Sequence, residues 1–159
     1  MLSNNYSMTF TNESSTTFQL ADCGTNDNGP LAKWVNKPAS SLPSEGGQTG
    51  LTMELDGTDI ELPPGNVWCI WWDSVSTWGY GFRINMYENV AHMGKSPTYS
   101  YGAGQFSSAP SHDDVDWVTV SGASTVGPEN TGILNVLING TQDDLQESLQ
   151  IMLNDPGSA

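Results

Sequence analysis

The chain has 159 residues, with 18 acidic side chains against four basic ones and a formal net charge of −14. The length corresponds to one domain. The charge excludes nucleic-acid binding and disfavours anionic membranes, because four scattered cations cannot neutralise a phosphate surface. Charged residues make up only 14% of the chain, and its abundance of Gly, Ser, Thr and Asn is typical of an all-β protein.

The N-terminal segment alternates between apolar and polar side chains, with Tyr6, Met8 and Phe10 on one face. A period of two residues predicts a half-buried strand. A turn follows at 12–15, and the alternation resumes in a second strand at 18–20.

A short strand is predicted at 31–35, and the strongest hairpin signal follows at 51–62. Apolar residues alternate in 51–55 and again in 58–62, and Asp56-Gly57 joins the two runs. Asp-Gly takes the positive φ of a tight hairpin turn at low cost.

Residues 67–73 are apolar on both faces, which predicts a strand in the middle of a sandwich, covered on both sides. Alternation places Trp71 with Val67 and Cys69, a face that we expect to point inward, and Trp68 and Trp72 on the opposite face. The next strand is predicted at 79–87.

Residues 88–114 show no clear period and contain several glycines and prolines, so they predict a long irregular connection. Two later segments, 115–122 and 132–140, bring the expected total to about nine strands. Many short strands separated by Gly, Pro and Asn predict one all-β domain, an antiparallel two-sheet β-sandwich.

We assign 1–141 to this sandwich and 142–159 to a C-terminal extension. The capping-box pattern from Thr141 to Asp144 predicts a short helix at 142–153, followed by a disordered tail. The alternation of apolar residues over 149–153 leaves a strand open as the alternative.

Catalytic and metal-binding patterns are weak. His112-Asp113-Asp114 with Asp116 contains ligand-type residues, but no calcium-loop pattern follows, and adjacent acids in a turn are usually solvated. The sequence has no nucleophile elbow and no phosphate-binding glycine loop. We therefore expect no enzyme, no cofactor and no metal site. Cys23 and Cys69 allow one disulfide, and their redox state is left open.

Four of the six tryptophans fall within eleven residues. Tryptophan suits a boundary between apolar and wet surroundings, so the cluster is either a core strand or a surface that contacts lipid, sugar or protein. Three other rings, those of Trp34, Trp71 and Trp117, are expected in the sandwich core. The candidate ligand contacts are Trp68, Trp72, Asp73, Trp78, Tyr80, Tyr99 and Tyr101.

Several short motifs resemble the aegerolysins, and in particular their bacterial branch, which contains the small component of binary insecticidal crystal toxins. They lie within 6–74 and 117–139 and are MTFTNESSTTFQL, LAKWVNKPASSLPSEGGQTGL, the Asp56-Gly57 turn, Trp71-Trp72-Asp73, Val120-Ser-Gly122 and Thr131-Gly-Ile-Leu-Asn-Val136. The resemblance implies an acidic β-sandwich of the pore-forming-toxin superfamily. It also implies binding to particular membrane lipids, often together with a larger pore-forming partner.

The aromatic cluster and the resemblance together predict a non-enzymatic protein of a cytolytic or insecticidal toxin system that binds a membrane lipid of the sphingolipid type. A carbohydrate-binding, lectin-like module is the alternative, because sugars also stack on Trp and Tyr. A third hypothesis makes the cluster an oligomer interface.

No signal peptide is expected, because no charged region and no apolar run follow Met1. We expect a protein that is made in the cytoplasm and acts extracellularly on target membranes, or else a secreted mature form.

Overall fold

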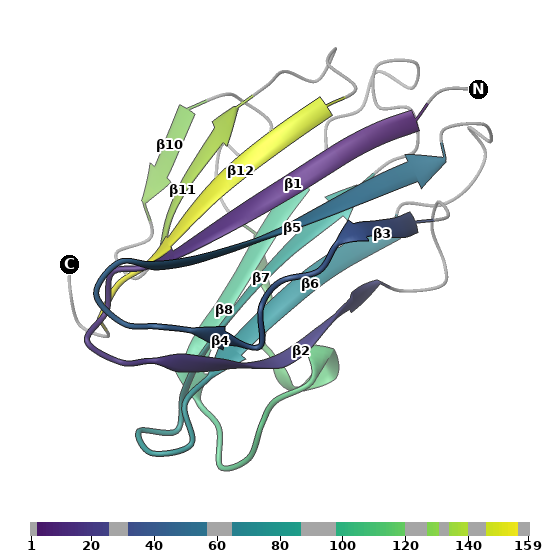
Figure 1. Cartoon of the computed structure of the whole chain (residues 1–159). Coiled ribbons are helices and arrows are strands. Elements are labelled where there is room, and N and C mark those ends of the chain that lie inside the picture. The colour runs from purple at the N-terminus through teal and green to yellow at the C-terminus, as the bar shows by residue number, and fades with distance from the viewer. Residues whose placement is uncertain are drawn as a thin grey trace.

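The computed structural model describes residues 3–25, 32–56, 65–86, 98–119, 127–130, 134–139 and 146–155, and it is a sandwich of two six-stranded sheets (Figure 1). The first sheet contains, in spatial order, β10 (Gly127–Asn130), β11 (Leu134–Asn139), β12 (Gln146–Leu153), β1 (Ser3–Asn12), β5 (Gly47–Asp56) and β3 (Ala32–Asn36). The second contains β4 (Ser41–Leu42), β2 (Phe18–Thr25), β6 (Gly65–Trp72), β7 (Trp78–Met86), β8 (Thr98–Gln105) and β9 (Val118–Thr119). A short 3-10 helix, η1 (His112–Asp114), follows β8. The predicted all-β sandwich is confirmed.

The last described strand, β12, lies beside the first, β1, near the centre of the first sheet (Figure 1). The two strands run parallel, and Phe10 pairs with Ile151. Every other strand pair in the described part of the chain is antiparallel. Residues 146–153 of the predicted C-terminal extension are therefore part of the sandwich.

The predicted helix at 142–153 is wrong over 146–153, which form β12, and 142–145 lie outside the described residues. Leu149, Ile151 and Leu153 are each at most 1% exposed and belong to the core. Burial of these three aliphatic side chains between the two sheets outweighs a local helical preference of a few tenths of a kcal/mol per residue. The alternation over 149–153 was the correct signal.

The irregular connection predicted at 88–114 is also wrong in part, because 98–105 form β8. Tyr99, Tyr101 and Ala103 alternate toward the core, but the glycines at 102 and 104 weakened the strand signal, because glycine is depleted in strands. In the earlier hairpin, β5 confirms the first arm, and the second arm at 58–62 lies outside the described residues.

The core fills the space between the two sheets. The Phe10 and Trp71 rings form a T-shaped pair with 5.7 Å between their centroids, and Phe18 and Tyr80 form another at 5.4 Å. The remaining buried apolar side chains of this cluster are Met8, Leu42, Leu51, Val67, Cys69, Phe82, Tyr99, Leu149, Ile151 and Leu153. The predicted inward face of β6, which carries Trp71, is thus confirmed.

A buried polar corner joins the two sheets where β1 ends. The Asn12 amide nitrogen donates to the carbonyl oxygens of Thr16 (2.7 Å) and of Leu42 in β4 (3.0 Å). Its amide oxygen accepts from the backbone N–H of Ser14 (3.0 Å) and from the hydroxyl of the same residue. Because Asn12 is 0% exposed, these bonds replace those lost to water.

The outer face of the second sheet is covered by residues 106–117, the segment between β8 and β9, here called the cover. Glycines in β7 and β8 leave room for it, because a Cβ atom at each would press on a side chain of that segment. The contacts are Phe106 over Gly79, Trp117 over Gly81 and Val115 over Gly102. Trp117 was expected between the sheets, but it lies half-buried on this outer face.

We predict that Gly102→Ala lowers the free energy of unfolding by about 1–3 kcal/mol, because the new Cβ overlaps Val115 and comes within 3.1 Å of the Asp116 carbonyl oxygen. Gly104→Ala is the matched control, since nothing lies within 4 Å of a Cβ there. Urea unfolding of both variants is the measurement. Equal effects of the two substitutions would contradict the proposed cover.

Candidate functional site

Two of the predicted ligand contacts do not reach the surface. Tyr80 and Tyr99 are each 1% exposed and lie in the core between the sheets, which corrects the expectation for both. The Tyr80 hydroxyl donates to the carbonyl oxygen of Asn154, and burial raises the pKa of Tyr80 to about 12. Tyr101 packs against the same core and is only partly buried. None of the three rings forms an external aromatic platform.

Trp68 lies on the outer face of the second sheet, where it packs over Gly24 and is tied to the covering segment. Its indole N–H donates to Asp22 Oδ2 at 3.0 Å, and the backbone N–H of His112 donates to the same oxygen at 2.9 Å. The Trp68 and His112 rings lie 4.4 Å apart between centroids. One carboxylate of β2 therefore holds both the tryptophan and the start of η1.

Arg83 extends this cluster on β7, directly opposite Trp68. Its Nη1 lies 3.2 Å from His112 Nε2, and its guanidinium stacks over the Trp117 ring at 4.7 Å. Because Arg83 can only donate, His112 Nε2 accepts, and the imidazole proton is assigned to Nδ1, which faces Asp113 at 3.0 Å. Burial lowers the pKa of Arg83. Asp22 and Arg83 thus hold the cover on the sheet through their contacts with His112 and Trp117.

Trp72 is also on the outer face, and the backbone of Phe106 holds it there. The Trp72 indole N–H donates to the Phe106 carbonyl oxygen at 3.1 Å. The Phe106 N–H in turn donates to the carbonyl oxygen of Thr77 at 2.7 Å. Phe106, directly after the last residue of β8, thus braces the β6–β7 turn (residues 73–77) through these two backbone hydrogen bonds.

Asp73 closes this turn from within. Its Oδ2 accepts from the backbone N–H of Ser76 at 2.8 Å, and hydrogen bonds from Ser76 hold the pKa of the Asp73 carboxyl below its ordinary value. Thr77 has a φ of 62°, a strained left-handed conformation for a β-branched residue. Asp73 therefore shapes the turn, and the side chain that the turn presents outward is Val75, which is 90% exposed.

Trp78 turns the other way and packs edge-on against Tyr80 at the end of the core, 6.0 Å between ring centroids. Beside it lies a groove of about 470 Å³, here called the turn-end groove. The groove is lined by Ser15, Thr16, Phe18, Ser76, Trp78, Gln105 and Asp155. Two aromatic rings are combined there with hydroxyl, amide and carboxylate groups, and the lining contains no cation.

The predicted residues therefore divide into separate environments. Trp78 and the turn that Asp73 closes lie at the turn-end groove, whereas Trp68 and Trp72 are held under the cover on the outer face. Sequence reasoning missed Val75 and the polar rim of the groove. The available signal was an aliphatic residue at the centre of a polar turn between two tryptophans. Nothing local in the sequence indicates that Ser15 and Asp155, 140 positions apart, share a hydrogen bond.

Comparisons with known proteins assign no family to the chain. No model of a known protein family matches the chain, and no curated protein is significantly similar to it in sequence. The resemblance to aegerolysins stays a prediction. In the part of the chain that the structure describes, no helix has the length and apolar character needed to cross a membrane.

We predict that Asp22→Ala lowers the free energy of unfolding by about 1–3 kcal/mol, because it leaves the Trp68 indole N–H and the His112 backbone N–H without an acceptor. Asp113→Ala is the matched control, since the Asp113 side chain is 97% exposed. Urea unfolding followed by tryptophan fluorescence measures both. A cost for Asp22→Ala no larger than that of the control would show that this carboxylate does not hold the cover.

Proposed function

We propose that the protein is a non-enzymatic membrane-lipid-binding protein that contacts a zwitterionic lipid surface through the β6–β7 turn and the adjoining turn-end groove. The observation that carries the proposal is Val75, which is 90% exposed at the tip of a braced turn. The other large apolar side chains exposed in the described residues, Val118 and Met152, are 51% and 38% exposed and lie on strands.

The turn is suited to enter the outer part of a lipid layer without rearrangement. The backbone of Phe106 braces it, and its carboxylate is bonded inward to Ser76. Transfer of a nearly fully exposed valine side chain out of water contributes about 1.5 kcal/mol or more, or about tenfold in affinity. The turn alone therefore supports weak binding, and further contacts must add to it.

The groove beside the turn supplies contacts of the right chemistry for a lipid head group. Trp78 offers an aromatic surface and Asp155 a carboxylate, and a substituted ammonium group is attracted to both. The hydroxyls of Thr16 and Ser76 lie at the rim, where a phosphate oxygen or a sugar hydroxyl would accept or donate. The groove therefore favours a choline- or ethanolamine-type head group.

Electrostatics selects the same class of membrane. With a net charge of −14 and no cation in the groove, an anionic lipid surface repels the protein. A zwitterionic surface does not impose this repulsion, and its outward ammonium groups meet the carboxylate of Asp155. We therefore propose neutral, sphingolipid-type or phosphatidylcholine-type membranes as the target.

The wider role in a cytolytic or insecticidal pair, with a larger pore-forming partner, belongs to the same proposal. It rests on the short aegerolysin-like motifs, of which Trp71-Trp72-Asp73 forms the end of β6 and the start of the braced turn. In such a pair this chain recognises the lipid surface, and the partner provides the pore.

A carbohydrate-binding module is the second candidate, favoured by the same groove. An aromatic ring beside hydroxyl, amide and carboxylate groups also suits a sugar, which stacks on the ring and bonds to the rim. The two candidates differ over Val75, because only membrane binding gains from an exposed aliphatic side chain at the tip of the turn.

Vesicle flotation with sphingomyelin–sterol vesicles tests the proposal. Val75→Glu is expected to weaken binding at least about tenfold, because it removes the apolar tip and adds a charge at the lipid surface. Val118→Glu is the matched control on β9 and is expected to bind like the parent chain. Asp155→Asn, which keeps an acceptor for Ser15, is expected to reduce binding, and Asp113→Asn to leave it unchanged.

A glycan array separates the two candidates. Saturable binding to one sugar class that Val75→Glu leaves unchanged, with no binding to any vesicle, would establish the carbohydrate module and overturn the lipid proposal. Equal loss of vesicle binding in the Val75 and Val118 variants would show that the turn is not the contact surface.

A further inference from the structure

The two cysteines of the chain form a facing pair inside the second sheet. Cys23 on β2 and Cys69 on β6 are directly opposite in the antiparallel register, 46 residues apart in sequence. A bulge between Leu20 and Asp22 adds one residue to β2, so that Leu20 and Cys23 both face the core. Both thiols are free, and their sulfurs lie 3.1 Å apart.

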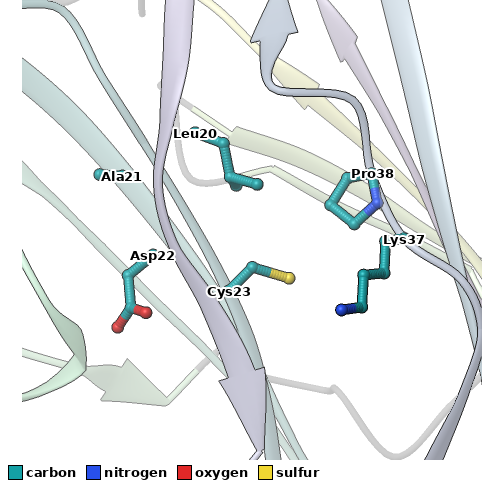
Figure 2. Close-up of a pocket in the computed structure, with 6 residues that line it drawn as sticks. All are labelled: Leu20, Ala21, Asp22, Cys23, Lys37 and Pro38. Carbon is teal, nitrogen blue, oxygen red and sulfur yellow. The ribbon is translucent and has the colours of Figure 1, made fainter.

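The two thiols are not equally accessible. Cys69 is 0% exposed and belongs to the core, whereas Cys23 is half-buried and lines a pocket of about 320 Å³. The pocket lies between β2 and the segment that follows β3, and its lining is completed by Leu20, Ala21, Asp22, Lys37 and Pro38 (Figure 2). A reagent from solution therefore meets the Cys23 sulfur first and reaches Cys69 only through it.

The surroundings of the pair favour the thiolate on the outer cysteine. The hydrogen bond from the Cys69 thiol lowers the pKa of Cys23 and outweighs burial and the Asp22 carboxylate, which both raise it. The positive charge of Lys37 adds a smaller lowering of the same pKa. Figure 2 shows the Cys23 sulfur and the Lys37 amine on the same side of β2, with the Asp22 carboxylate on the other side. Burial raises the pKa of the Cys69 thiol. We therefore expect the Cys23 thiolate to attack a reagent first, and the Cys69 thiol to react more slowly and afterwards.

We propose that Cys23 and Cys69 form a thiol–disulfide exchange site, in which Cys23 is modified first by a low-molecular-weight disulfide and Cys69 then closes a cross-strand bond. The Cys23 thiolate attacks one sulfur of the reagent, forming a mixed disulfide and releasing one thiolate. Cys69 gives its proton to that thiolate and attacks the Cys23 sulfur, which releases the second half of the reagent as a thiolate that takes up a proton from water. The protein loses two electrons and two protons, and the disulfide is reduced to two thiols.

The experiment treats the reduced full-length chain with oxidised glutathione near neutral pH and follows its intact mass. The parent chain is expected to pass through a single glutathione adduct to a product that lacks two hydrogen atoms. Cys69→Ser is expected to stop at a stable adduct on Cys23, and Cys23→Ser to remain unmodified over the same time. Cys69→Ala replaces Cys69→Ser if circular dichroism shows that the serine variant does not fold.

Lys37 supplies a finer test, because its side chain is exposed and its replacement leaves the core intact. Lys37→Gln is expected to slow adduct formation about threefold near neutral pH by raising the pKa of Cys23, and Lys37→Arg to keep the parent rate. An adduct on Cys69 in folded Cys23→Ser as fast as that on Cys23 would overturn the proposal. A parent chain that stays unmodified, or that ends as a stable adduct, would overturn it as well.

Discussion

The second sheet must be covered on both of its faces, and most of the features of this molecule depend on that constraint. Its central strand, β6, has apolar side chains on both sides, with Cys69 and Trp71 facing the core and Ile70 facing outward at 0% exposure. One face is covered by the first sheet. The other is covered by the segment after β8, which can lie flat because Gly81 and Gly102 present no side chain to it. Aliphatic and aromatic groups are thereby removed from water on both faces.

Contacts with the cover determine which clustered tryptophans have a structural role. On the outer face, the N–H of Trp68 is satisfied by Asp22 and the N–H of Trp72 by the Phe106 carbonyl oxygen, so both rings are structural parts of the cover. The same Phe106 braces the β6–β7 turn through its own N–H. As a result, a dense run of aromatic residues leaves one almost fully exposed apolar group at its end, Val75. Of the clustered tryptophans, Trp78 lines the turn-end groove, whereas Trp68 and Trp72 are held on the outer face by their hydrogen bonds.

Sequence reasoning succeeded where the signal was local and periodic. The alternation of β1 and the two-sided apolar pattern of β6 predicted both strands and the inward face of Trp71 correctly. It failed for β8, where Gly102 leaves room for a segment packed on the sheet, and it favoured a helix for β12, although the alternation over 149–153 also indicated a strand. The parallel pairing of β12 with β1 joins residues about 140 positions apart. Such pairings leave no local trace, and for the same reason the polar rim of the turn-end groove, to which Asp155 contributes, was not predicted.

One pair of neighbouring strands carries both features to which we assign chemistry. Phe18, at the start of β2, lines the turn-end groove, and Cys23 lies five positions further along the same strand, about 16 Å away at the rise of an extended chain. Cys23 and Cys69 are 46 residues apart in sequence. In the chain-entropy description, a disulfide between them lowers the entropy of the unfolded chain and so raises the free energy of unfolding by about 4 kcal/mol. Because the two sulfurs already lie 3.1 Å apart in register, forming the bond brings them about 1 Å closer. Oxidation therefore raises the free energy of unfolding and leaves the turn-end groove, at the other end of β2, unchanged.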